Sequence, residues 1–323
     1  MTRIDVHVHF VPDFYRAALV EAGLSRPDGI KAIPPWSAEE ALATMDRLHV
    51  SRSYLSISSP GVHFGDDAAA AALARRCNEE AAELTAHHPE RFAWFASVPL
   101  PDVDAAAAEA EHALDRLGAN GLVVETNARG QYLGDPALEP LYALAAARRV
   151  PVFVHPTTPF EAEHLALGYP RPMLEFLFET TRSITDLVLS GVLQRHPDLR
   201  VIVPHAGAAL PVLANRIELL LPILAEGGPG DGTAPPSMRE ALRALHFDLA
   251  GAPVHELLRS LLSVADPDRI HYGSDYPFTP PDACVRLAER LDSSDLLDAD
   301  LRARIDSANA EALFARATVG ARS

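Results

Sequence analysis

The chain has 323 residues, of which 48% are hydrophobic and 22% are charged, and its formal net charge at pH 7 is −16. Nucleic acids and anionic membranes select clustered basic residues, so this acidic balance argues against both kinds of partner. The sequence opens without a basic stretch or a long apolar core, and its two cysteines, Cys77 and Cys284, give no disulfide framework. We therefore expect a protein of the cytoplasm.

Eight β-rich runs alternate with longer helical patterns. The first run is 4–10 (IDVHVHF), and the other seven are 50–58, 91–99, 120–127, 150–157, 200–207, 245–251 and 269–277. Strands that alternate with helices predict parallel βαβ units. Eight such units in a chain of this length predict an α/β fold of the (β/α)8 type, a TIM barrel, with residues 1–323 as a single domain.

The segments between these runs show apolar residues at helical spacing. The predicted helices are 37–48, 66–88, 103–118 and 172–195. Ser37 stands three residues before Glu40 at the start of the first of them, which is the pattern of a capping box.

Two segments interrupt the alternation. Residues 10–36 are the longest irregular-looking stretch after a strand, and we expect them to form a loop or lid over the active face. Residues 227–236 (GGPGDGTAPP) predict a flexible loop inside the sixth unit. A doubly wound open sheet would show the same alternation, but HVHFVPDF stands where its glycine-rich nucleotide fingerprint would follow the first strand.

Ionisable side chains gather at the ends of the predicted strands. His7 and His9 point to the same face of the first strand, because side chains alternate with a period of two. His155, His205 and Asp275 each stand at the C-terminal end of a later run. The C-terminal ends of barrel strands build the active site, so these residues are expected to meet at one mouth of the barrel.

Imidazole nitrogens and a carboxylate oxygen suit a cation such as zinc, whereas magnesium and calcium prefer oxygen ligands. We predict one divalent ion, Zn²⁺ first and Mn²⁺ as the alternative, bound by His7, His9, His155 and Asp275. His205 would stay unligated beside it and exchange protons near neutral pH, with Asp275 sharing the catalytic role. The alternatives are histidines satisfied by backbone groups, a His205 that only orients a ligand, and an Asp275 that only caps the SDYP turn.

The motifs IDVHVHF, VFVHPT, VPHAG and YGSDYPF, in this order and at these spacings, resemble those of the amidohydrolase-related enzymes. Within that superfamily the chain is most similar to the nonoxidative decarboxylases, typified by 2-amino-3-carboxymuconate-6-semialdehyde decarboxylase and γ-resorcylate decarboxylase. The segments LSISSPG, FETTRSITDLVLSG and HAGAALP resemble the 6-methylsalicylate decarboxylases in particular. The resemblance implies a metal-dependent homodimeric enzyme with His7, His9, His155 and Asp275 as ligands and His205 as the acid/base.

Two features depart from the family pattern. Arg16, Arg26 and Arg47 precede the second strand, but none matches the context of the substrate-binding arginine of the muconate-semialdehyde enzymes. Of the 28 lysine and arginine residues only Lys31 is a lysine, so the carboxylated strand-4 lysine that bridges two metals in hydrolytic relatives cannot exist here. Glu125, at the end of the fourth run, is the alternative bridge, and a single metal is the preferred prediction.

Further side chains are candidates for lesser roles. The aromatic residues that would wall an aromatic substrate, or simply pack, are Phe10, Trp36, Phe160 and Phe278. The histidines expected to be solvated or structural are His63, His87, His88, His164 and His271. Arg182 and Arg216 are expected to form structural ion pairs, although an arginine in the context of Arg216 reaches the neighbouring subunit's site in the muconate-semialdehyde enzymes.

Two reactions fit this predicted site. We favour a metal-dependent carboxy-lyase that removes CO₂ from a small aromatic or unsaturated carboxylic acid, such as a salicylate-type hydroxybenzoate. The alternative is a hydrolase that cleaves a lactone or an amide with metal-activated water, because a fold does not choose its chemistry. A binding protein without catalysis would leave the ligand set without a role.

Overall fold

The structure is a computed structural model, and it describes residues 2–224, 236–251 and 255–315. Eight strands form one sheet in which all hydrogen-bonded neighbours run parallel. In sheet order they are β1 (Arg3–His9), β2 (Val50–Ser56), β3 (Phe92–Ser97), β4 (Gly121–Glu125), β7 (Pro151–His155), β8 (Arg200–Val203), β9 (His246–Asp248) and β10 (Ile270–His271). Except for its last residue, the predicted loop 227–236 lies outside the described residues.

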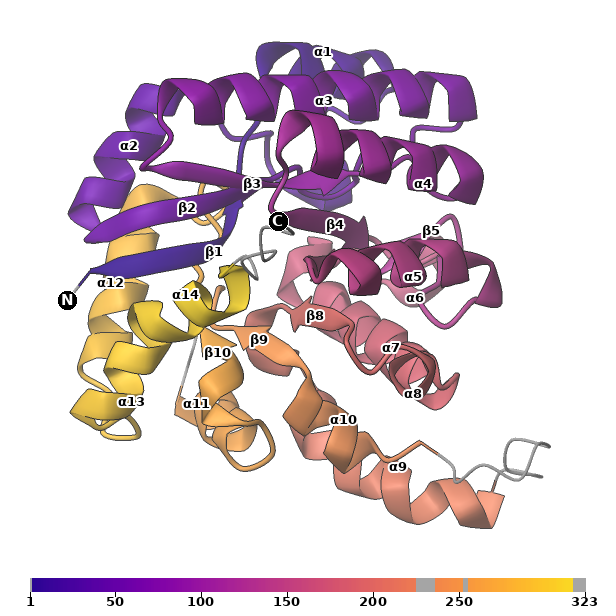
Figure 1. The fold of residues 1–323 in the computed structure, drawn as a ribbon, viewed down its shortest axis with the longest axis vertical. Coiled ribbons are helices and arrows are strands. Elements are labelled where there is room, and N and C mark those ends of the chain that lie inside the picture. The colour runs from indigo at the N-terminus through magenta and orange to yellow at the C-terminus, as the bar shows by residue number, and fades with distance from the viewer. Residues whose placement is uncertain (1, 225–235, 252–254, 316–323) are drawn as a thin grey trace, which may run out of the picture.

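Backbone hydrogen bonds between β1 and the chain after β10 close the sheet into a barrel. The amide of Val6 donates to the carbonyl of Tyr272 at 3.1 Å, and the amide of His9 donates to the carbonyl of Tyr276 at 2.7 Å. Val8 and Tyr276 also form a parallel bridge. Figure 1 shows the strands in the middle of a ring of helices. The predicted (β/α)8 barrel is therefore confirmed.

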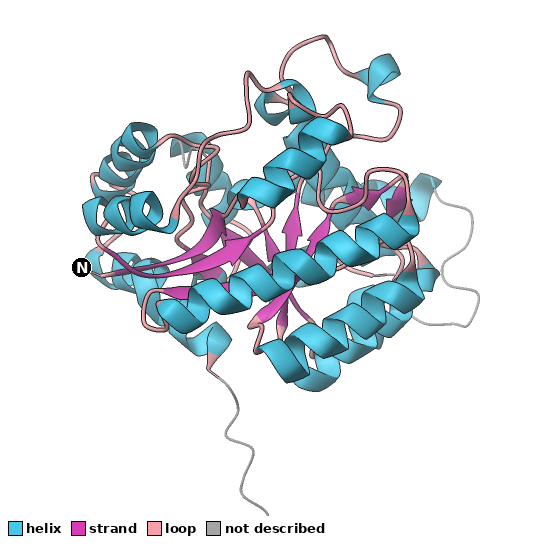
Figure 2. Cartoon of the chain, turned by 90° about the horizontal axis from the view of Figure 1, so that it is seen from above, coloured by secondary structure: helices cyan, strands magenta, loops and turns pink. Residues whose placement is uncertain are grey.

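Helices follow the strands and cover the outside of the barrel (Figure 2). The longer ones are α1 (Asp13–Glu21), α2 (Ala38–Arg47), α3 (Asp67–His87), α4 (Val103–His112), α5 (Glu139–Arg148), α7 (Glu175–Leu189), α9 (Leu210–Leu224) and α12 (Pro281–Asp292). The shorter ones are α6 (Ala162–Leu165), α8 (Val192–Arg195), α10 (Met238–Ala244), α11 (His255–Leu262), α13 (Ala299–Ala303) and α14 (Asn309–Phe314). A small hairpin, β5 (Asn127–Ala128) and β6 (Gln131–Tyr132), follows β4.

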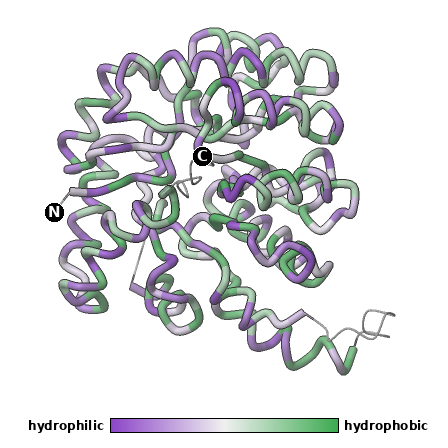
Figure 3. The backbone as a smooth tube through the Cα atoms, in the orientation of Figure 1, coloured by the Kyte–Doolittle hydropathy of each residue, from purple (hydrophilic) through white to green (hydrophobic). Residues whose placement is uncertain are grey.

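Hydrophilic and hydrophobic residues alternate along the helices in Figure 3, as expected for helices that bury one face against a barrel. The hydroxyl of Ser37 caps α2 by accepting a hydrogen bond from the amide of Glu40 at 3.1 Å, as the sequence predicts. Within the described residues, no helix combines the length and the apolarity that crossing a bilayer requires.

Three predicted elements differ from the observed ones. The pattern 172–195 forms two helices, because Gly191 has a φ of +78° and breaks the chain between α7 and α8. The stretch 10–36 is not irregular, since it contains α1, which buries Tyr15 and Leu19. The run 269–277 pairs with β9 at only two residues, and the chain then turns at Asp275, whose φ is +61°.

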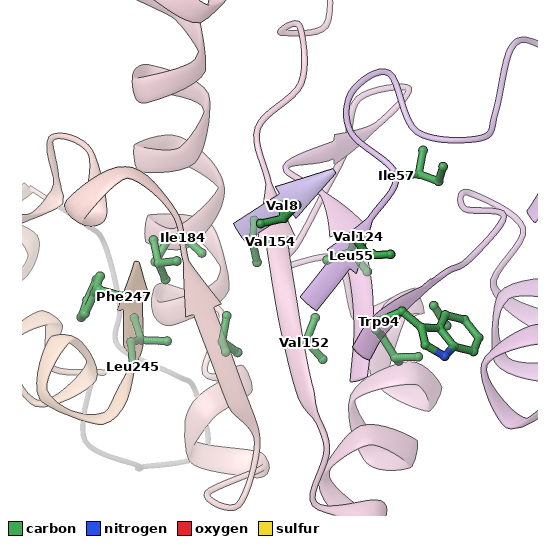
Figure 4. Close-up of a cluster of buried hydrophobic side chains, with 14 of the residues drawn as sticks. Val8, Leu55, Ile57, Trp94, Val124, Val152, Val154, Ile184, Leu245 and Phe247 are labelled. Carbon is green, nitrogen blue, oxygen red and sulfur yellow. The ribbon is translucent and has the colours of Figure 1, made fainter. Parts of the chain in front are cut away.

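Two layers of apolar side chains stabilise the barrel. Inside it, Tyr54 and Phe95 pack with neighbours from other strands, and Phe314 of α14 stacks on Tyr54 with the ring centroids 3.7 Å apart. Between the strands and the helices lie residues such as Trp94 and Val154 (Figure 4). Apolar side chains therefore fill the interior of the barrel at the end near α14.

A pair of histidines lies buried between β9 and β10. Nδ1 of His246 lies 2.9 Å from Nε2 of His271, and Arg269 contacts the other ring nitrogen of His246 at 3.0 Å. Burial is the main cause that lowers the pKa of His246 to about 2 and the pKa of His271 to about 4. His271 is therefore structural, which is one of the two roles expected for it.

Acid should destabilise the fold through these two histidines. The unfolded chain takes up a proton at each of them near pH 6.5, whereas folded His271 stays neutral down to about pH 4. The free energy of unfolding should fall as the pH drops from about 6.5 to 4, by roughly 3 kcal/mol for His271 alone. Replacing His271 by glutamine should flatten this part of a urea-unfolding profile recorded in EDTA, and an unchanged slope would contradict the expectation.

Candidate metal centre

Three imidazoles and one carboxylate converge at the C-terminal mouth of the barrel. His7 and His9 come from β1, His155 comes from the end of β7, and Asp275 comes from the chain after β10. One possible ligand atom of each residue lies within 4.8 Å of those of the other three. The histidines are buried, and the side chain of Asp275 is 20% exposed. The structure thus brings together all four residues that the sequence predicts as ligands.

The atoms at the centre of this group are metal-binding types. Nε2 of His7 lies 3.1 Å from Nε2 of His9, so at least one of these nitrogens must present a lone pair to the centre. Oδ1 of Asp275 lies 3.3 Å from Nε2 of His9 and 3.7 Å from Nε2 of His7. His155 adds a third imidazole, and its buried Nδ1 has no hydrogen-bond partner among the described residues. This donor set fits a divalent cation of the zinc type.

Asp248, at the end of β9, supports the group and was not predicted from the sequence. Its Oδ2 lies 2.9 Å from Nδ1 of His7, while its Oδ1 accepts hydrogen bonds from the amides of His205 (3.1 Å) and Ala250 (2.9 Å). A carboxylate on Nδ1 fixes the tautomer of His7 and turns the lone pair of Nε2 toward the centre. The signal that could have found it is the single acid in LHFDLAG, placed at a strand end like Asp275.

Of the other two histidines, His9 has a hydroxyl as its support, whereas Nδ1 of His155 faces Glu125 without a hydrogen bond. The hydroxyl oxygen of Ser56, on β2, lies 3.0 Å from Nδ1 of His9. Oε2 of Glu125 lies 3.5 Å from Nδ1 of His155, and neither atom has a hydrogen-bond partner among the described residues. Burial raises the pKa of Glu125 well above its ordinary value. Glu125 does not belong to the group of four, and its neutral form would be a poor ligand for a second metal.

Burial and neighbouring charges set the protonation states. Burial alone would raise the pKa of Asp275, but the neighbouring imidazoles of His205 and His9 hold this pKa well below its ordinary value. Burial lowers the pKa of His9 and, more strongly, that of His155. For His7 burial acts in the same direction and is the largest single cause, but the neighbouring carboxylates, Asp248 first among them, together outweigh it and raise the pKa. At neutral pH the centre therefore holds two neutral imidazoles and an ionised carboxylate, the forms that bind a cation.

His205 lies beside the group without belonging to it. Its Nε2 is 4.0 Å from Oδ2 of Asp275, and its buried Nδ1 has no hydrogen-bond partner among the described residues. A Cβ atom on Gly251 would lie 2.7 Å from Cδ2 of His205, and Gly251 also has a φ of +70°, so only glycine fits there. The imidazole is therefore placed to exchange a proton with Asp275 or with a bound molecule.

A cavity of about 550 Å³ opens above His155, His205 and Asp275. Its apolar wall contains Met173, Phe176, Leu177, Leu257 and Phe278. Its rim includes Asp28, Ile30, Lys31, Ala32 and Pro34. The predicted cover 10–36 thus reaches the cavity through its second half, and the size and lining suit a small flat molecule.

Comparison with known proteins identifies the family. A sequence profile described as Amidohydrolase matches residues 4–316. The chain belongs to the amidohydrolase family. It is 37% identical over 320 residues to a 6-methylsalicylic acid decarboxylase of Penicillium expansum, which covers 98% of this chain and 97% of the relative.

Two further likenesses agree with this assignment. A gamma-resorcylate decarboxylase of Rhodococcus jostii is 28% identical to this amidohydrolase over 294 residues, 84% of this chain and 86% of the relative. The crystal structure of an amidohydrolase II matches with a TM-score of 0.89 and 33% identity, over 97% of this chain and 99% of the other. The family resemblance read from the motifs is therefore confirmed.

Of the aromatic residues predicted to wall a substrate, one lines the cavity of this amidohydrolase. Phe278 does so, with its ring centroid 5.5 Å from that of His9. Phe10 is buried and packs on Trp36 at 6.1 Å between centroids. Phe160 is 53% exposed and lines a separate cavity.

The arginines singled out in the sequence also differ in how far the structure agrees with their expected roles. Arg182 forms the structural ion pair expected of it, with Glu179. Arg216 is exposed on α9 and forms no ion pair within the described part of the chain, so the pair predicted for it is not found. Arg47 is bound to Asp282 on the outside of the barrel, which removes it as a substrate ligand.

Proposed function

We propose that this amidohydrolase is a metal-dependent nonoxidative decarboxylase, a carboxy-lyase that acts on a small aromatic acid of the salicylate type. The observation that carries the proposal is the group of three buried imidazoles and one carboxylate at the floor of a largely apolar cavity. Near full-length similarity to a 6-methylsalicylic acid decarboxylase supports loss of CO₂ over the hydrolytic alternative.

The proposed ligands of one divalent cation are His7, His9, His155 and Asp275, with Zn²⁺ preferred and Mn²⁺ as the alternative. When bound, the cation would supply Lewis-acid stabilisation of negative charge on the substrate's oxygens. Asp248 acts behind these ligands by fixing the ring of His7, with which it makes a 2.9 Å contact.

The proposed proton donor is the pair formed by His205 and Asp275. Their facing atoms, Nε2 and Oδ2, are 4.0 Å apart, and both residues line the cavity. The proton adds to the ring carbon that carries the carboxylate. The bond from that carbon to the carboxylate then breaks, its electron pair restores the aromatic ring, and CO₂ leaves. The apolar wall keeps water from the reacting carbon and favours departure of an uncharged product.

The test is to load the purified protein with Zn²⁺ or Mn²⁺, add ortho-hydroxybenzoates and follow CO₂ release. We expect CO₂ and the matching phenol in equal amounts, and close to one metal ion per chain by elemental analysis. Cleavage of lactones or esters without any CO₂ would replace the proposal with the hydrolase, and a protein that binds no metal would remove the ligand assignment.

We further propose that the chain is one catalytic domain that acts in the cytoplasm as a homodimer. Cys77 and Cys284 are free and buried, which fits a reducing compartment. On α9, Val212, Leu219 and Ile223 are 65%, 61% and 73% exposed, and such apolar side chains on one helix favour self-association. Light scattering on the purified protein measures the oligomeric state directly.

A further inference from the structure

The one lysine of this chain lines the cavity above the proposed metal site. Of the 28 lysine and arginine residues, 27 are arginines, and no arginine lines this cavity. Among the described residues that line it, Lys31 is therefore the only permanently cationic side chain. Lys31 is exposed, and it forms no hydrogen bond or ion pair with any residue that the structure describes. Its ammonium group is therefore available to a ligand.

Two arginines hold the segment that carries Lys31. Arg16 donates from its two terminal nitrogens to the carbonyls of Ile33 (2.9 Å) and Pro34 (2.6 Å). Arg26 donates to the carbonyl of Ile30 at 3.2 Å. The backbone on both sides of Lys31 is thus bonded to α1 and to the turn before it, which keeps the lysine at the rim of the cavity. Both arginines are thus engaged with backbone carbonyls, and neither of them lines the cavity.

The acid nearest to Lys31 in the chain is engaged elsewhere. The carboxyl group of Asp28, on the same rim, accepts a hydrogen bond from the hydroxyl of Thr158. Burial raises the pKa of Asp28, so this group offsets the positive charge of Lys31 less than an ionised carboxylate would. The net charge of −16 repels anions from the molecule as a whole, and a cation at the mouth reverses this effect locally.

We propose that Lys31 attracts the anionic aromatic acid into the mouth of the cavity and so selects acids over neutral phenols. The inference rests on the proposed function, because the anion is the acid that the proposed reaction consumes, and its carboxylate passes Lys31 before it reaches the proton-donating pair at the floor. Lys31 stands at the rim, whereas His155, His205 and Asp275 lie at the floor. Its contribution should therefore appear in substrate binding and in KM more than in kcat.

The first test compares three variants of the metal-loaded protein. Lys31→Gln should weaken salicylate binding, measured by calorimetry, about fivefold and raise KM to match, the size expected for one exposed ion pair. Lys31→Arg should restore most of the binding. Arg52→Gln is the matched control, because it removes one exposed charge that is paired 3.7 Å from Glu90 and does not line the cavity. Wild-type affinity in Lys31→Gln, or equal weakening in Arg52→Gln, would overturn the inference.

A second test uses the fact that Lys31 is the only side-chain amine. Acetylation with an amine-specific reagent should weaken salicylate binding in the wild type and not in Lys31→Arg, which keeps its charge. Salicylate should also slow acetylation of Lys31, followed by mass spectrometry; equal rates with and without salicylate would overturn the inference. Binding that depends on Lys31 in a protein that releases no CO₂ would refute the proposed reaction alone, whereas CO₂ release that is indifferent to Lys31 would refute this inference alone.

Discussion

Replacing His205 by alanine is expected to lower kcat about 10²- to 10⁴-fold, the usual contribution of a positioned acid/base group. The imidazole faces Oδ2 of Asp275 at 4.0 Å, so its removal takes away the partner that exchanges protons with this carboxylate. Metal content should stay at the wild-type level, because His205 is not one of the four converging ligands. CO₂ release measures the first quantity and elemental analysis of the purified variant measures the second.

His164→Ala is the matched control for this experiment. His164 also follows β7 on the side of the barrel that carries the site, but its side chain is 75% exposed and it does not line the cavity. We expect this variant to keep wild-type kcat. A fully active His205→Ala protein would exclude His205 from the mechanism, and a His205→Ala protein without metal would mean that the loss of activity is a loss of the cation.

Replacing Asp248 by asparagine is expected to weaken metal binding about 10- to 100-fold, the usual effect of removing a carboxylate that orients a metal-binding histidine. Asparagine keeps the shape of Asp248 and can still accept the bond from the amide of His205. Its amide nitrogen would face Nδ1 of His7, where the acid now stands 2.9 Å away, so the two groups would present donors to each other. Competition with a chelator gives the affinity for Zn²⁺.

Asp5→Asn is the control for this substitution. Asp5 is buried on the same strand as His7, and its Oδ1 accepts bonds from the amides of His7 and Ser274, both at 3.1 Å. Burial raises the pKa of Asp5 to about 7, so a neutral side chain at this position is close to its native state. We expect Asp5→Asn to bind Zn²⁺ as the wild type does. Equal affinity in Asp248→Asn would show that His7 needs no support from β9.

Much of the proposed site was predictable because strand ends in a parallel barrel meet at one mouth. His7, His9, His155 and Asp275 needed only their order and strand position, and the structure brings them within 4.8 Å of each other. Asp248 was missed although it obeys the same rule. A lone acid that ends a short strand resembles any polar strand end until the closed barrel places it behind His7.

The differences in the fold have local causes. The segment after β1 looked irregular for two reasons. Helix α1 begins after Pro12 without a side-chain cap, and only two of its residues, Tyr15 and Leu19, are buried, which gives a weak apolar pattern. Gly191 breaks the helix although the apolar spacing continues on both sides. The spacing of apolar residues could not predict this break, because it carries no information about the φ of +78° at Gly191. Lys31 stood out in the sequence only by composition, and its place at the rim depends on bonds from Arg16 and Arg26 to the backbone around it.

The backbone seam between β1 and the chain after β10 has a consequence for biosynthesis. His7 and His9 leave the ribosome more than two hundred residues before the strand that completes the ring and before Asp275. A nascent chain can therefore expose His7 and His9 long before the last of the proposed ligands, Asp275, has been synthesised. The proposed metal is then loaded late in maturation, and a chain truncated before residue 270 should leave the ribosome without a competent centre.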